Sequence, residues 1–190
     1  MLGRLLDERG VPEERQPPGG DVYAALVRAI VGQQLSVHAA RAIYGRLLER
    51  FDGRPPTPEQ ILADEPDELR VAVGLSHAKT AYLRSLAEHV VSGELELDRL
   101  EQLSDDEVMA DLVAVKGIGA WSAHIFLMFT LGRPDVLAVG DLGIRRAVER
   151  AYELPALPNA AELTAIAEPW RPYRTAACML LWRSLGNAPT

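Results

Sequence analysis

Cysteine is nearly absent from this sequence. The single cysteine, Cys178, lies in an apolar stretch of the 190-residue chain. One thiol excludes a disulfide framework, and it also excludes the sets of thiolates that bind zinc or iron–sulfur clusters. A hydrophobic content of 48% in a chain of this length is enough to bury a substantial core without disulfides or bound metals. We therefore expect a protein of a reducing, cytoplasmic compartment.

Long apolar runs and alternating strands are missing as well. Charged residues interrupt the start of the chain, MLGRLLDERGVPEERQ, every few positions, so we expect neither a signal peptide nor a membrane span. No segment combines period-2 alternation with hairpin turns, although ELELDRL at 94–100 is ambiguous and could be an extended connector. The sequence therefore predicts an all-α protein.

Lysine is scarce, and acidic residues outnumber basic ones by 27 to 20. The chain has only two lysines, Lys79 and Lys116, and its formal net charge is −7. This charge disfavours nonspecific adhesion to nucleic acid, although a small footprint can bind through backbone amides and a few local cations. The histidines have no H-x-x-x-H spacing, so we expect no metal ligation by His38, His77, His89 or His124.

Helix start signals recur along the chain. Capping residues precede the helical patterns of 22–32, 37–51, 77–93 and 160–167, and a short helix follows the Thr57-Pro58-Glu59 sequence. Ser104 and Glu107 form an S-x-x-E capping box, and Gly186 is expected to end the last helix. The other capping residues are Asp21, Ser36, Ser76 and Asn159.

A short turn with two glycines, KGIG at 116–119, separates two helical patterns. Its glycines permit positive φ angles and a close approach of the backbone to a ligand. The next helix is expected to begin around Ala120, so its first N–H groups and its positive dipole end favour an anion such as phosphate. The turn is not a dinucleotide fingerprint, because Ser122 occupies the sixth position and no strand–helix–strand unit surrounds it.

Three segments together resemble a known family, the helix-hairpin-helix DNA glycosylases. They are IVGQQLSVHAARAIYGRLLERF at 30–51, LVAVKGIGAWSAHIFLMFTLGRPDVLAVGDLGIRRAV at 112–148 and PWRPYRTAACMLLW at 169–182. Within this family, the sequence most resembles the 3-methyladenine (alkylated base) DNA glycosylase II branch. This resemblance implies a DNA repair enzyme that works as a monomer in the cytoplasm, and that is associated with the nucleoid if the source is bacterial. The implied partner is double-stranded DNA that contains damaged bases.

The resemblance also implies an architecture. We expect a single domain over 1–190 with two helical lobes and a cleft between them. The central lobe would span about 21–131, and the second lobe would combine the N-terminal segment with about 132–190. Some family members carry an added N-terminal β-rich lobe, and we expect none here.

Asp141 follows Val139-Gly140, where the family has its catalytic aspartate. A carboxylate there would stabilise the positive charge that develops on the sugar during cleavage of an N-glycosidic bond, and would orient the attacking water. Read from the residues alone, Asp141 is also an ordinary N-cap for the helix that follows. Asp135, the neighbouring carboxylate, is expected to be structural.

Aromatic residues match the family's base pocket. An alkylated purine is cationic and stacks well on indole, so Trp121 and Trp182 are candidates, with Tyr44, Trp170 and Tyr173 as weaker ones. Core packing is the alternative for each of them. Bifunctional relatives carry a lysine at position 121, so Trp121 indicates a monofunctional, water-using glycosylase.

The resemblance assigns DNA contacts to residues of two turns. Gln34 matches the position that wedges into the duplex, with Gln33 beside it, although both could simply form hydrogen bonds at a helix junction. The family also holds a monovalent cation (Na⁺ or K⁺) with backbone carbonyls, which here would belong to Val113, Val115 and Ile118. The remaining expected DNA contacts are Lys116, Gly117, Ile118, Gly119, Ala120 and Ser122.

Two other functions remain open from the sequence. A noncatalytic helix-hairpin-helix module would use the same turn only to hold DNA, and the acidic charge is compatible with a helical interaction scaffold. The sequence does not choose among 3-methyladenine, 7-methylguanine, ethenoadenine and hypoxanthine as damaged bases.

Overall fold

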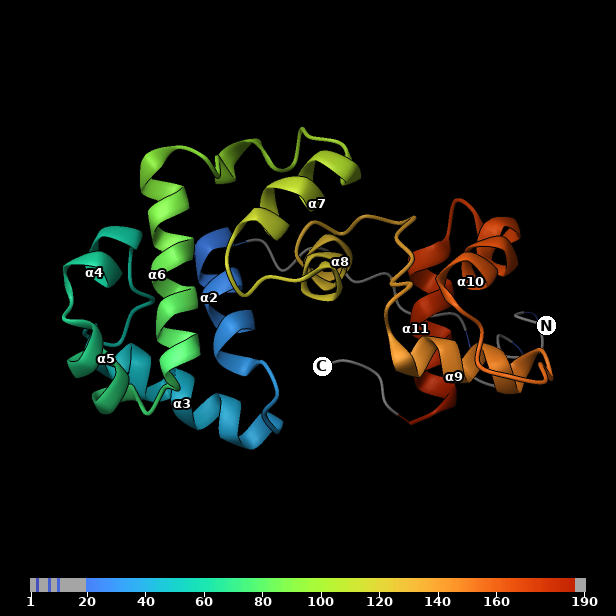
Figure 1. The fold of residues 1–190 in the computed structure, drawn as a ribbon, viewed down its shortest axis with the longest axis horizontal. Coiled ribbons are helices and arrows are strands. Elements are labelled where there is room, and N and C mark those ends of the chain that lie inside the picture. Colours follow the sequence, from blue (N-terminus) through green and yellow to red (C-terminus); the bar gives the residue numbers. More distant parts are fainter. Residues whose placement is uncertain (1–2, 4–6, 8–9, 11–19, 187–190) are drawn as a thin grey trace. The chain divides into compact units, whose positions relative to one another are not determined.

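A computed structural model describes residues 3, 7, 10 and 20–186 of the chain (Figure 1). These residues form helices joined by loops, with no strand among them, which confirms the all-α prediction. They belong to two compact units, one of residues 20–123 and one that contains the residues from 124 onward. The predicted lobe boundaries and the cleft stay predictions, and most of the N-terminal segment assigned to the second lobe lies outside the described residues.

The unit of residues 20–123 is built around one long helix, α6. Figure 1 shows α6 between α4 and α2, and it packs on both of these helices and on α5. Leu83 and Leu86 of α6 are fully buried, as are Val27 of α2, Leu47 of α3 and Leu69 of α5. The elements are α2 (Val22–Gly32), α3 (Val37–Arg50), α4 (Pro58–Ala63), α5 (Pro66–Val73), α6 (His77–Ser92), η1 (Leu97–Arg99), α7 (Asp105–Ala114) and the first residues of α8 (Ala120–Phe129).

The predicted helix starts of this unit are confirmed. Ser36 and Ser76 accept hydrogen bonds from backbone N–H groups of the first turns of α3 and α6, and Asp21 does the same for α2. Thr57 and Ser104 both form complete capping boxes. The ambiguous stretch at 94–100 is a connector with the short 3₁₀ turn η1, and it pairs with no strand among the described residues.

Helix α5 was not predicted. Glu65 takes the N-cap role, accepting from the N–H groups of Asp67 and Glu68, and Pro66 occupies the first helical position. The start signal was missed because glutamate is outside the usual set of short capping side chains.

The second unit contains the end of α8 and the helices that follow it. Helix α11 packs on α9, and α10 packs on η2. Ile144, Val148, Leu163 and Leu181 are fully buried in this core. Helix α11 ends at Ser184 and Gly186 follows in the left-handed region, as predicted. The further elements are α9 (Leu142–Ala151), α10 (Ala160–Ala167), η2 (Glu168–Trp170) and α11 (Arg174–Ser184).

The thiol of Cys178 belongs to this core. It is fully buried on α11, and burial, with a smaller contribution from the charge of Asp141, raises its pKa to about 12. A protonated, enclosed thiol is a poor nucleophile and a poor metal ligand. Cys178 is therefore a packing residue.

Candidate functional site

Asp141 is the N-cap of α9. Its Oδ1 accepts a hydrogen bond of 2.7 Å from the backbone N–H of Ile144, so the capping role that its position permitted is confirmed. The same oxygen accepts a second bond, of 3.0 Å, from the indole Nε1 of Trp182 on α11. Two donors from different helices therefore hold the half-buried carboxylate in one orientation.

Space around this carboxylate depends on a glycine. A Cβ at Gly143 would lie 3.0 Å from Asp141 Oδ1 and 3.4 Å from Cδ1 of Trp182. The lack of a side chain there allows the indole to approach α9. Trp182 itself is only 2% exposed, and its ring centroid is 6.1 Å from that of Phe129. The indole is thus a fixed part of the core that presents one polar atom to Asp141.

The loop that leads to Asp141 is clamped at its other end by Arg174, the first residue of α11. Arg174 Nε donates to Asp135 Oδ1 at 2.7 Å, and its Nη2 donates to the Asp135 carbonyl at 2.6 Å. Arg171 Nη1 lies 2.6 Å from Asp135 Oδ2. Burial alone would raise the pKa of Asp135, but the hydrogen bonds and charges of the two arginines outweigh it and lower this pKa. These contacts give Asp135 the structural role expected of it.

One face of α11 therefore supports the whole loop. Thr175 Oγ1 donates to the Arg133 carbonyl at 2.6 Å and accepts from the Val136 N–H at 3.1 Å. Arg174, Cys178 and Trp182 are spaced four residues apart, a spacing that places side chains one above another along a helix. The helix contacts the loop at points from the Arg133 carbonyl to the Asp141 carboxylate.

The glycine hairpin lies in the other unit and joins α7 to α8. Gly117 has a φ of +91°, and a Cβ there would lie 2.2 Å from Cγ of Tyr82 on α6. Only glycine fits both the backbone conformation and the space. The Lys116 N–H donates to Ser85 Oγ, also on α6, at 3.2 Å. Helix α8 starts at Ala120 as predicted, and the Lys116 side chain is exposed.

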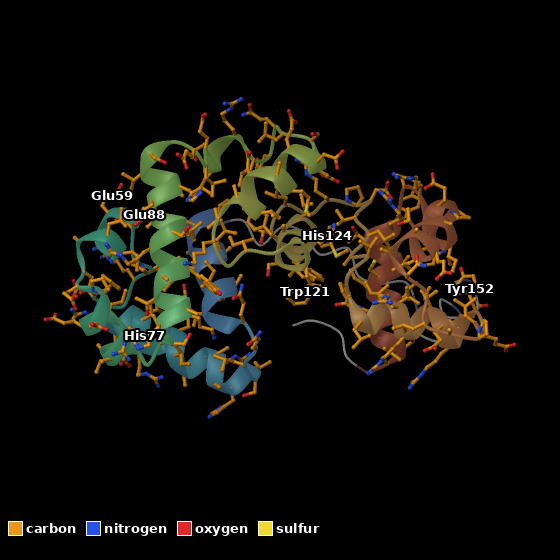
Figure 2. All side chains as sticks on the ribbon, viewed as in Figure 1. Glu59, His77, Glu88, Trp121, His124 and Tyr152 are labelled. Carbon is orange, nitrogen blue, oxygen red and sulfur yellow. The ribbon has the colours of Figure 1, made fainter. Side chains whose placement is uncertain are left out.

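A cavity of about 410 Å³ opens beside the hairpin. Trp121 in its wall is 46% exposed, and Figure 2 shows this side chain projecting from the first turn of α8. None of the lining residues is acidic, although the chain is acidic overall. This wall can therefore accept a polyanion without direct repulsion. The lining includes Gln33, Gln34, Lys79, Gly117, Trp121 and Ser122.

Lys79 also lines this cavity, although the sequence predicted a DNA contact for Lys116 and none for Lys79. Its Nζ donates to the Val31 carbonyl in the last turn of α2 at 2.7 Å, and burial lowers its pKa. Tyr82 stands three residues further along α6, behind Gly117. Lys79 therefore supports the end of α2, and Tyr82 supports the hairpin. Their spacing of three residues on one helix was the sequence signal that could have indicated this.

The other aromatic candidates lie in different surroundings. Tyr44 is 9% exposed on α3, with the guanidinium of Arg28 4.8 Å from its ring centroid, and it does not line the cavity at the hairpin. Trp170 donates to the hydroxyl of Tyr152 at 3.2 Å in the second unit. Tyr173 is 67% exposed. Of these candidates, Trp121 lies at the hairpin and Trp182 donates to Asp141.

A second hollow, of about 430 Å³, has the opposite character. Asp21, Glu96 and Asp98 line it, and so does the buried Tyr23. Burial, and then the charges of Glu59 and Asp21, raise the pKa of Tyr23. Carboxylates at its wall repel phosphate, so this hollow does not suit DNA.

Residues 27–172 match the HhH-GPD superfamily of base excision DNA repair proteins. The chain belongs to this superfamily. It is 36% identical to DNA-3-methyladenine glycosylase 1 of Schizosaccharomyces pombe over 97% of its own length and 78% of that protein. It is 30% identical to the putative DNA-3-methyladenine glycosylase YfjP of Bacillus subtilis, of which it covers 59%.

Solved structures of this superfamily share the fold. The DNA-3-methyladenine glycosidase of Bacillus halodurans matches with a TM-score of 0.86 and 39% identity, over 97% of this chain and 84% of that one. The Schizosaccharomyces pombe 3-methyladenine DNA glycosylase in complex with abasic DNA matches with a TM-score of 0.82 and 33% identity, over 98% and 91% of the two chains. The resemblance inferred from the sequence is thereby confirmed, and the individual site residues stay predictions.

Two negative findings apply to the part of the chain that the structure describes. No helix there is long and apolar enough to cross a membrane. No group of three or more histidine, cysteine, aspartate or glutamate side chains there could hold a metal ion.

Proposed function

We propose that this HhH-GPD protein is a DNA glycosylase that releases alkylated purines, of the 3-methyladenine and 7-methylguanine type, by hydrolysis of the N-glycosidic bond. The names of its relatives support this substrate class. The observation that carries the proposal is the carboxylate of Asp141, held by donors from α9 and α11 on one oxygen. The product on the DNA is an abasic site.

Asp141 performs the chemistry in this proposal. Departure of the base leaves positive charge on the deoxyribose, and a fixed carboxylate stabilises that charge better than mobile water does. The same carboxylate orients the attacking water molecule. Because Trp182 and Ile144 already hold it, little reorganisation is needed when the charge develops.

Trp121 is proposed to stack on the extruded base. Alkylation gives the purine a positive charge, and an electron-rich indole binds such a ring through cation–π attraction as well as stacking. Trp182 and Tyr44 stay proposed members of the base pocket on the family resemblance alone. Trp121 stands where bifunctional relatives carry the lysine that forms a Schiff base, so water is the nucleophile and the enzyme does not cut the strand.

The hairpin is proposed to hold the DNA backbone. N–H groups of the loop and of the first turn of α8 bind phosphate, assisted by the exposed Lys116. Gln34 wedges into the duplex at the extruded nucleotide. The enzyme works on double-stranded DNA as a monomer in the cytoplasm, near the nucleoid if its source is bacterial. The full set of proposed hairpin contacts is Lys116, Gly117, Ile118, Gly119, Ala120 and Ser122.

A monovalent cation fits the proposed hairpin site. Among the described residues, the carbonyls of Val113 and Ile118 accept no backbone hydrogen bond, and the Val115 carbonyl accepts one, from Ile118 at 3.0 Å. The negative end of the α7 dipole adds attraction for a cation. Bound Na⁺ or K⁺ would fix the loop. DNA affinity should then be higher in potassium than in tetramethylammonium salts of equal ionic strength, and equal affinities would contradict the site.

Incubation with alkylated duplex DNA tests the function directly. We expect free 3-methyladenine or 7-methylguanine in the supernatant, resolved by chromatography, while the strands stay intact until alkali is added. Strands that break without alkali would reject the monofunctional mechanism. If no modified base were released, the enzymatic proposal would be rejected in favour of a noncatalytic DNA-binding module. Asp141 would then serve only as the N-cap of α9.

A further inference from the structure

The turn between α2 and α3 has an unusual backbone. Gln34 adopts a φ of +57°, in the left-handed region that residues other than glycine seldom occupy. Its side chain is exposed, and Leu35 and Val37 beside it are 38% and 49% exposed. A residue keeps such a strained backbone conformation only when the surrounding structure holds it in place. Strain of this kind is often found at functional sites.

The surroundings that hold this turn come from distant parts of the chain. Gln33 Nε2 donates to the carbonyl of Gly117 in the hairpin at 2.8 Å, across 84 residues of sequence. Lys79 Nζ fixes the last turn of α2 through the Val31 carbonyl. The turn is therefore attached to the hairpin directly and to α6 through a lysine.

The hairpin rests on the same helix. Gly117 lies against the ring of Tyr82, one turn of α6 beyond Lys79. The three segments form a closed set of contacts in which the first turns of α6 support both the α2–α3 turn and the hairpin. Gln33 supplies a direct bond between the two segments that the proposed function brings to DNA.

We propose that Gln33 is a positioning residue whose amide bond to Gly117 keeps the Gln34 turn in register with the hairpin. The inference rests on the proposed function, because it takes the hairpin and Gln34 as DNA contacts. When the hairpin holds a phosphate, the bond places Gln34 at a fixed distance along the same strand. Gln33 thus acts through Gln34 and the hairpin, and it need not touch DNA.

A double-mutant cycle tests this coupling. Gln33→Met keeps the length of the side chain and removes the N–H donor without adding charge. We expect single-turnover base release to fall about 5-fold, which corresponds to the loss of one hydrogen bond of about 1 kcal/mol, while the Kd for abasic DNA changes less than about 3-fold. A fluorescent base analogue placed beside the damaged nucleotide should report the same fall in base extrusion.

The neighbouring residue provides the matched control. Gln34→Ala removes the proposed wedge, and because Gln33 acts through it, Gln33→Met combined with Gln34→Ala should match Gln34→Ala alone within about 2-fold. If the two substitutions lowered base release independently, so that their effects multiplied in the double variant, the proposal would be overturned. It would also be overturned if Gln33→Met raised the Kd by as much as it lowered base release, because Gln33 would then contact DNA itself. Gln33→Leu also removes the donor without adding charge, and it serves if Gln33→Met melts at a lower temperature.

The outcome is separable from that of the proposed function. If the wild-type chain released no base, the enzymatic proposal would fail, but the fluorescent analogue would still report extrusion in all four members of the cycle. If wild-type release is normal and the cycle is multiplicative, only the role of Gln33 is rejected.

Discussion

Replacement of Asp141 by asparagine should lower the rate of base release at least about 100-fold, the scale seen when one preorganised charge-stabilising group is removed from an active site. Asn keeps an oxygen for the Ile144 N–H and for the indole of Trp182, and it is as good an N-cap as Asp. The substitution therefore removes charge and leaves the cap. Single-turnover release from alkylated DNA measures the rate, and a gel shift on abasic DNA should show unchanged affinity.

The control for this prediction is the other carboxylate of the same loop. Asp135→Asn breaks the charge pairs with Arg174 and Arg171, and should lower stability by about 2 kcal/mol, the scale for hydrogen bonds to a charged group. Base release below the melting temperature should stay within about 3-fold of wild type. If Asp135→Asn abolished release and Asp141→Asn did not, the catalytic role would belong to Asp135.

Sequence patterns predicted most of the fold because its helix boundaries are set locally. Ser36, Thr57 and Ser104 each cap a helix through contacts within three residues, so the sequence alone contains the cause. Helix α5 was missed because its cap is a glutamate, and η1 because three residues of 3₁₀ turn have no periodicity to detect.

The sequence pointed to candidate site residues but not to their contacts. The motif pointed to Asp141, but the bond from Trp182 joins residues 41 apart and depends on the small size of Gly143. Likewise, nothing local to Gln33 indicates that its amide binds the Gly117 carbonyl 84 residues away. Long-range bonds of this kind follow from how helices pack, so a spacing within one segment cannot reveal them.

Replacement of Gly117 by alanine should damage both folding and DNA binding. An alanine at a φ of +91° is disfavoured by about 1–2 kcal/mol, and its Cβ would lie 2.2 Å from Cγ of Tyr82, so the ring or the loop must move. We expect a total loss of about 2–4 kcal/mol in the free energy of unfolding. Since the displaced loop also carries the carbonyl that Gln33 binds, affinity for abasic DNA should fall at least about 10-fold, by about 1.4 kcal/mol or more.

Gly119 separates these two effects. A Cβ at Gly119 meets no atom within 4 Å, and its φ lies outside the left-handed range, so Gly119→Ala should unfold at nearly the wild-type denaturant concentration. If the exposed hairpin backbone lies against phosphate, the added methyl group will still weaken DNA binding. Weakened binding with intact stability would thus assign the hairpin surface to DNA, whereas wild-type affinity in both alanine variants would remove the hairpin from the interface.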